Sequence, residues 1–185
     1  MSLQIFEQRY LDLVAHCMRE GEGFGVVWLQ QGSEVSGGSL DTPNVGEYGT
    51  YARIVDWDQL PNGLLGITIE GHEPFDVQSV WREPSGLVKA EVVWRDIPET
   101  IQLPDRHASL AEVLEGLLRH PQIQRLQLDS DLTDGWRVGA QLAQLLPIDE
   151  GLKYQLQGLT SVEQLLEEMD NILVELSGES DQTGR

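Results

Sequence analysis

The sequence predicts an α+β protein in which a curled antiparallel sheet, forming a pseudo-barrel, is followed by a helical bundle. Two observations predict this class. Apolar and polar residues alternate through much of the first half, whereas past Pro98 and Pro104 the apolar residues recur every three or four positions. We therefore expect a β-rich subdomain over residues 1–98, a helical subdomain over residues 99–176 and a flexible tail over residues 177–185.

The chain opens with an expected amphipathic helix over residues 4–20. Its apolar residues lie three and four positions apart, and Gly21 follows as a typical helix end. A short apolar run over residues 24–29 predicts a buried strand. Residues 30–47 are rich in Gly, Ser, Asn and Pro without any period, which predicts a long exposed loop.

Four further strand-like runs follow at close spacing and predict an antiparallel meander. They cover residues 49–58, 64–71, 74–82 and 87–95. The pair Asn62-Gly63 predicts a type I′ hairpin turn, and the sequence Glu-Pro-Ser-Gly at residues 83–86 predicts the last turn. The alternation directs Leu65, Ile67 and Ile69 to a core and their neighbours to water.

Five tryptophans are unusual for a chain of this length. They are Trp28, Trp57, Trp81, Trp94 and Trp136. Core packing is the ordinary role of tryptophan, and the alternation places Trp81 and Trp94 on the buried face. Trp57 stands between two aspartates at a strand end, and we expect it to be partly exposed. It is a candidate partner-binding residue, with packing inside the hairpin as the alternative.

The second half contains several helix start signals. The sequence Ser-Leu-Ala-Glu at residues 109–112 predicts a capping box, and Asp134 is expected to cap a helix that ends at Pro147. A short helix is expected over residues 149–157. The sequence Thr-Ser-Val-Glu at residues 160–163 is expected to open the last helix.

The net charge of −19 excludes several partners. Lys89 and Lys153 are the only lysines, and both halves of the chain are acidic. Nucleic acid and anionic membranes require clustered Lys and Arg, so we expect neither as a partner. The single Cys17 and the lack of an apolar run long enough to span a bilayer predict a cytoplasmic protein.

No catalytic constellation stands out, and we expect no enzyme activity, no cofactor and no metal. Neither lysine has the glycine-rich context of a phosphate-binding loop, and no serine lies in a Gly-x-Ser-x-Gly elbow. The four histidines lack the spacing of metal ligands, and solvated or capping roles are expected for them. They are His16, His72, His107 and His120.

Five motifs in order carry a resemblance to a known family. They are Ile5-Phe6-Glu7-Gln8-Arg9-Tyr10, Phe24-Gly25-Val26-Val27, Gly49-Thr50-Tyr51-Ala52-Arg53-Ile54, Leu60-Pro61-Asn62-Gly63 and Gly71-His72-Glu73-Pro74-Phe75. Together they resemble the substrate-binding (N-terminal) domain of Lon proteases, and most of all the short stand-alone bacterial proteins made only of that domain. We expect these motif residues to be structural, and on helical spacing Ile5, Phe6, Arg9 and Tyr10 should pack against the sheet.

The resemblance implies a PUA-like β subdomain followed by a helical bundle. In the full-length proteases this domain recognises unfolded or tagged polypeptides, and neither the ATPase nor the protease domain follows here. The resemblance therefore implies a non-catalytic polypeptide-recognition domain with unfolded or basic polypeptides as partners. An RNA-binding PUA-like module and an enzyme of unrecognised class are the alternatives.

The chain departs from the family pattern in two places. The family has an extra strand and turn before the Ile-Phe-Glu segment, and only residues 1–4 precede that segment here. We therefore expect a sheet without its first strand, and an unpaired edge that a second copy closes to form a homodimer. Residues 71–76 also lack the arginines that relatives carry around the phenylalanine, so no anionic contact is expected there.

Overall fold

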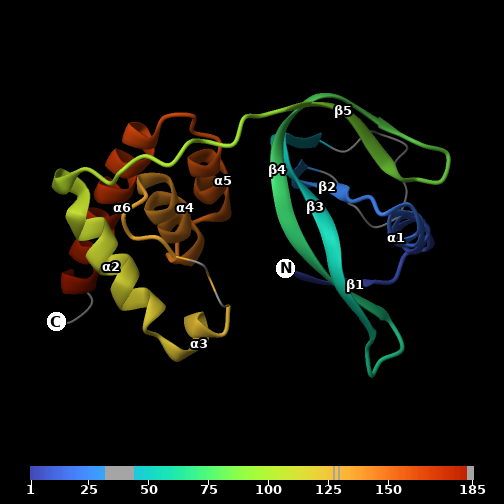
Figure 1. Ribbon diagram of the computed structural model, residues 1–185, viewed down its shortest axis with the longest axis horizontal. Coiled ribbons are helices and arrows are strands. Elements are labelled where there is room, and N and C mark those ends of the chain that lie inside the picture. Colours follow the sequence, from blue (N-terminus) through green and yellow to red (C-terminus); the bar gives the residue numbers. More distant parts are fainter. Residues whose placement is uncertain (32–43, 127, 129, 183–185) are drawn as a thin grey trace. The chain divides into compact units, whose positions relative to one another are not determined.

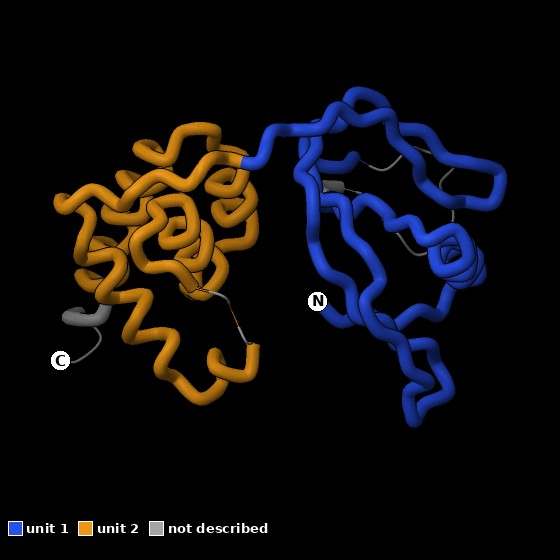
Figure 2. Tube along the Cα trace, viewed as in Figure 1, with its two compact units in different colours: residues 1–97 blue, residues 98–185 orange. Residues whose placement is uncertain are grey.

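The structure is a computed structural model that describes residues 1–31, 44–126, 128 and 130–182. It divides into two compact units, Met1–Ile97 and Pro98–Arg185 (Figure 2). Each unit has a hydrophobic core of its own. The predicted α+β class is confirmed, because an antiparallel sheet in unit 1 is followed by packed helices in unit 2.

Unit 1 is built on a five-stranded antiparallel sheet (Figure 1). Its strands are β1 (Ser2–Ile5), β2 (Phe24–Gln31), β3 (Asn44–Gln59), β4 (Leu65–Arg82) and β5 (Val88–Trp94). The order is β1-β4-β3-β2, and β5 pairs with the later part of β4. The helix α1 (Gln8–Glu20) packs Val14 against Ala52, Ile67 and Ile69, and this cluster is the core of the unit.

The expected helix over residues 4–20 is wrong at its start, because Ser2–Ile5 form strand β1 and α1 begins only at Gln8. Leu3 and Ile5 pair with Ile67 and Leu65 of β4 and pack against the core. Their spacing of two suits a strand, and a strand this short is too brief to show a period of its own.

The two strands expected over residues 64–71 and 74–82 form one long strand, β4, with irregular pairing along its length. The turn before it is also different from the predicted type I′ turn. Gly63 donates its N–H to the Leu60 carbonyl at 2.8 Å, so Pro61 and Asn62 are the central residues. Gly63 follows them with φ of 83°, a conformation that glycine tolerates. Proline has its φ fixed near about −65°, which suits the first central position of an ordinary turn, so the turn forms one residue earlier than predicted.

The expected loop over residues 30–47 is shorter than predicted. Gln31 still belongs to β2, and Asn44 already begins β3. The remainder of that expected loop, residues 32–43, lies outside the described residues.

The prediction that Trp81 and Trp94 are buried is wrong, because they are 42% and 56% exposed. Alternation identifies the side of a strand, but burial also requires a layer that covers that side. Among the described residues, the core cluster of unit 1 contains no residue from β5, so the packed core does not extend to this strand there.

Unit 2 consists of helices around a continuous apolar core. They are η1 (Asp105–His107), α2 (Ala108–Leu118), α3 (Pro121–Gln124), α4 (Gly135–Leu145), α5 (Glu150–Gln157) and α6 (Val162–Gln182). Leu110, Leu142, Leu166 and Met169 are among the fully buried residues of this core. The predicted Asp134 cap is confirmed, because its Oδ1 accepts the Trp136 N–H at 3.1 Å.

Three details of unit 2 differ from prediction. The capping box at residues 109–112 is wrong, because the short helix η1 leads directly into α2 and places Ser109 inside a helix. At the start of α6 it is Ser161, not Thr160, whose hydroxyl accepts the Gln164 N–H, at 3.4 Å. The helix α6 then runs to Gln182, so residues 177–182 of the expected tail are helical, and residues 183–185 lie outside the described residues.

The ring of Phe75 on β4 packs over two glycines of neighbouring strands. A Cβ atom built on Gly25 of β2 would lie 2.9 Å from Phe75 Cζ, and one on Gly49 of β3 would lie 2.8 Å from the same atom. Trp94 closes the cluster by an edge contact with Phe75, with ring centroids 6.1 Å apart. These glycines are therefore required because an aromatic ring occupies the space of a side chain.

We expect Gly49→Ala to lower the free energy of unfolding by about 2 kcal/mol or more, because the added methyl group overlaps the Val26 carbonyl and the Phe75 ring. Urea unfolding followed by circular dichroism measures this change. Gly116→Ala is the control, since a Cβ there meets nothing within 4 Å. Its position inside α2 predicts a gain of about 0.5–1 kcal/mol. A neutral Gly49→Ala would contradict the packing role.

Candidate functional site

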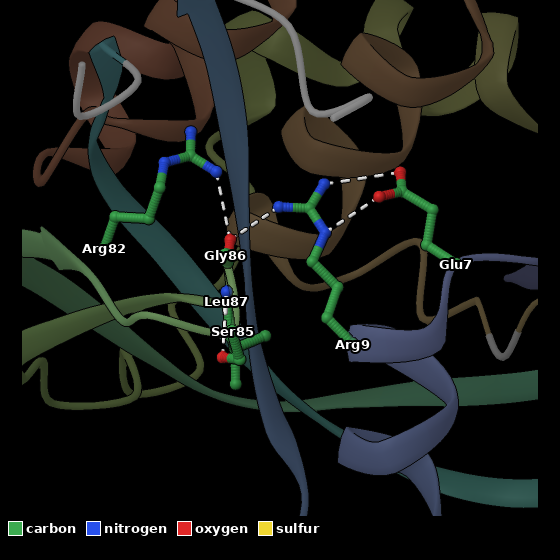
Figure 3. Close-up of polar contacts among 6 residues, drawn as sticks. All are labelled: Glu7, Arg9, Arg82, Ser85, Gly86 and Leu87. Carbon is green, nitrogen blue, oxygen red and sulfur yellow. Dashed lines mark hydrogen bonds and ion pairs between the residues drawn. The ribbon is translucent and has the colours of Figure 1, made fainter. Parts of the chain in front are cut away.

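The Glu7-Arg9-Tyr10 motif anchors the start of α1 to the turn between β4 and β5. Arg9 is 5% exposed, and its Nε donates to Glu7 Oε2 at 3.0 Å. Its Nη1 donates to the Gly86 carbonyl at 2.6 Å, where Arg82 Nη1 also donates at 3.0 Å (Figure 3). The Arg9 guanidinium also lies over the Tyr10 ring, 4.5 Å from its centroid. These contacts fix α1 to the β4–β5 turn, so the motif has a structural role.

Most of the other motif residues also lie in structural positions. Ala52 is buried in the core of unit 1, and Ile5, Phe24 and Ile54 pack against that core. Gly71 lies on β4 where a Cβ would meet Thr50 Cγ2 at 3.1 Å. Phe6 is the exception, because it is 61% exposed and does not lean against the sheet. It precedes α1, so the helical spacing that predicted its position does not apply.

Trp57 is the candidate residue that the structure leaves accessible, at 58% exposure, which confirms its predicted partial exposure. A bulge in β3 between Ile54 and Asp56 shifts the register with β4. Beyond this bulge Trp57 pairs with Ile67, which in turn pairs with Leu3 of β1. Paired residues share a face of the sheet. Trp57 therefore ends a row of side chains that leads into the core.

Beside Trp57, one edge of β3 has no partner strand among the described residues. Pairing between β2 and β3 stops at Phe24 and Ala52. In the described part of the chain, residues 53–58 of β3 pair with β4 alone. We call residues 53–58 the Trp57 edge. The backbone N–H of Trp57 donates to the side-chain oxygen Oδ1 of Asp56 at 2.9 Å.

Two shallow hollows flank Trp57. The first has a volume of about 250 Å³ and lies between the end of α1 and the Trp57 edge. Its lining residues are Cys17, Met18, Gly21, Glu22, Arg53, Ile54, Val55, Asp56 and Trp57. The second, of about 220 Å³, lies over β1, β3 and β4. Its lining residues are Ser2, Leu3, Gln4, Asp56, Trp57, Asp58, Leu60, Gly66, Ile67 and Thr68.

The surface around Trp57 is apolar at its centre and mainly acidic at its rim. Met18 and Val55 are exposed beside Trp57. Glu22, Asp56 and Asp58 supply carboxylates, against the single guanidinium of Arg53, which lies over the Tyr51 ring. An exposed tryptophan with adjacent aliphatic side chains is suited to bury an apolar group of a partner.

Cys17 lies at the floor of the first hollow but is not suited to nucleophilic chemistry. Burial, together with the negative charge of Glu22, raises the pKa of its thiol above the ordinary value. The thiolate is the reactive form of cysteine, so a raised pKa keeps this group protonated at neutral pH.

The histidines have ordinary structural roles or face solvent. His16 and His72 are exposed, and His120 accepts the Gln122 N–H as a cap, as expected. His107 differs from expectation because it is buried, with Nδ1 2.5 Å from Asp170 Oδ2. Arg106 donates to its Nε2 at 3.0 Å, so the ring ties η1 to α6.

Among the described residues, no group of three or more His, Cys, Asp or Glu side chains is placed to hold a metal ion. Within the same residues, no helix is long and apolar enough to cross a membrane.

Sequence reasoning missed the residues that surround Trp57. Val55 and Arg53 lie on the same strand, but the bulge at Val55 leaves no mark in the alternation. Met18 and Glu22 come from the end of α1, distant in sequence from β3. The only available signal was the pair of aspartates on either side of Trp57, since charges on a strand often mark an edge.

Unit 1 is therefore a sheet with a packed helix, and its described residues include a strand edge with aspartates on either side of an exposed tryptophan. The chain matches the family model of the ATP-dependent protease La (LON) substrate-binding domain over residues 1–175 and belongs to this family. The match covers 175 of the 185 residues of this chain.

Solved structures agree with this assignment. A Lon N-terminal domain protein from Xanthomonas campestris is similar with a TM-score of 0.74 and 33% identity, over 91% of this chain and 86% of that chain. The N-terminal domain of the Mycobacterium avium complex Lon protease has a TM-score of 0.56 and 14% identity, over 92% of this chain and 88% of that chain. The second likeness shows the fold alone. No curated protein sequence matches the chain.

We expect Arg9→Ala to lower the free energy of unfolding by about 3 kcal/mol, because it leaves the Glu7 carboxylate and the Gly86 carbonyl without this buried donor. Arg19→Ala on the same helix is the matched control. Its ion pair with Glu20 is exposed, so the change should stay within about 0.5 kcal/mol. Urea unfolding measures both variants, and equal effects would contradict the anchoring role.

Proposed function

We propose that this domain is a non-catalytic recognition module for unfolded polypeptides and that the surface around Trp57 is its binding site. The observation that supports this most is the 58% exposure of Trp57 between two hollows at an open strand edge. Exposing an aromatic ring of this size has a cost in water that burial against a partner removes. Membership of a substrate-binding domain family makes a polypeptide the natural partner.

The charge of the chain favours basic clients. The net charge is −19, and the carboxylates of Glu22, Asp56 and Asp58 lie around the exposed tryptophan. Long-range attraction to a basic chain raises the rate of encounter, and the apolar centre then supplies the affinity. Structured RNA, the partner of other PUA-like modules, carries the same sign of charge as this surface.

Reduced and alkylated lysozyme, which is basic and unfolded, should bind, while folded lysozyme of similar charge should not. Fluorescence anisotropy of the labelled client measures the affinity. Trp57→Ala should weaken binding about tenfold or more, the range of a central aromatic contact. Trp81→Ala is the matched control, since Trp81 is also exposed but lies away from both hollows.

Two results would contradict the proposal. The first is a lack of binding to any unfolded protein at tens of micromolar client, the upper range of a useful affinity. The second is binding of structured RNA with no binding of polypeptides, which would favour the RNA-binding alternative.

We also propose that the domain works in the cytoplasm and forms a homodimer. Cys17 is buried and unpaired, as suits a reducing compartment. Among the described residues β1 pairs with β4 alone, and its other edge would be the surface that a second copy pairs with. Light scattering over a wide concentration range should show a dimer, and a monomer throughout that range would contradict this proposal.

A further inference from the structure

From the open edge of β3 we infer that a basic, extended polypeptide binds as an added strand along residues 53–58, with an apolar side chain packed on Trp57. This inference rests on the proposed function and specifies how the partner is held. Backbone hydrogen bonds would supply sequence-independent affinity, and the side chains around the edge would supply selectivity.

The backbone of the Trp57 edge supports strand addition. Residues 53–58 pair with β4 on one side, and among the described residues no strand pairs on the other side. The Trp57 N–H, which donates to the exposed Asp56 carboxylate, is a donor that a peptide carbonyl would take over. A stretch of this length spans about 20 Å, which about six residues of an extended peptide would match.

The hollow beside this edge provides the space for a strand. It follows residues 53–57 and is bounded on its far side by Met18, Gly21 and Glu22 at the end of α1. Its volume of about 250 Å³ accommodates side chains of a peptide that lies along the edge. The hollow and the open edge therefore involve the same residues.

The side chains of the edge indicate the chemistry of the peptide. Trp57 ends the row that runs through Ile67 to Leu3, so the next position in that row belongs to an apolar side chain of the added strand. Neighbouring positions of the peptide would lie near Asp56, Asp58 or Glu22. Lysine or arginine alternating with apolar residues fits this arrangement.

A second copy of the chain fits the edge less well than a basic peptide does. Pairing of this edge with its own counterpart would bring the aspartates of both copies together, and like charges that face each other across strands are destabilising. The homodimer proposed above uses the outer edge of β1, which is a different strand.

The test uses a short unlabelled peptide that alternates lysine with valine, and two N-methylated forms of it. One form is methylated on the lysine amides and the other on the valine amides. In an added strand only one of these two sets faces β3, because successive amides point to opposite sides. Isothermal titration calorimetry with the full chain should show one form weakened at least tenfold and the other close to the unmethylated peptide.

Equal affinities of the two methylated forms would overturn strand addition, even if unfolded lysozyme binds and the proposed function holds. Failure of every unfolded polypeptide to bind would instead overturn the proposed function. Hydrogen exchange gives an independent readout: outward-facing amides of residues 53–58 should become protected when the peptide is added. Protection that rises with protein concentration alone would assign the edge to a second copy and overturn the inference.

Two matched double variants test the preference of the Trp57 edge for a basic peptide. The double variant Asp56→Asn/Asp58→Asn should weaken binding of the lysine-valine peptide several-fold at low salt. The double variant Glu167→Gln/Glu168→Gln changes the net charge equally at exposed positions of unit 2 and should leave binding unchanged. Equal losses in both would show that only the overall charge acts, which would overturn the assignment of these aspartates to the site.

Discussion

The buried guanidinium group of Arg9 is the interaction on which the rest of unit 1 depends. A charge in this position is tolerated only because Glu7, the Gly86 carbonyl and the Tyr10 ring surround it. Glu7 immediately precedes α1, Tyr10 lies in the first turn of that helix, and Gly86 lies in the β4–β5 turn. The contact therefore sets where α1 lies on the sheet, and the other end of that helix bounds the hollow at the Trp57 edge.

Regular patterns made much of the fold predictable from the sequence. Alternation identified the core side of β4 at Ile67 and Ile69, which are buried. A period near 3.6 identified the helices of unit 2, and the Asp134 cap needed only a local rule about side-chain acceptors. In each case the information lies within a few neighbouring residues. The exposure of Trp57 could also be predicted from its flanking aspartates.

What could not be predicted depends on contacts between distant residues or on breaks in a pattern. Arg9 and Gly86 lie 77 positions apart, and nothing local to either indicates their hydrogen bond. The bulge near Val55 decides which side chains stand beside Trp57, yet it is created by pairing with β4. Trp81 and Trp94 follow the pattern of buried residues and are exposed, because burial requires a covering layer that the pattern does not encode.

The hydrogen bond from the Trp57 N–H to the Asp56 carboxylate has a consequence for the kinetics of any strand that joins this edge. The donor is already satisfied, so an incoming carbonyl exchanges one hydrogen bond for another and gains little net free energy from it. The displaced carboxylate remains nearby and competes to return. For the inferred added strand, this one donor would therefore contribute little to affinity, and the residence time would depend on the other backbone groups of the edge and on the side chains of the strand.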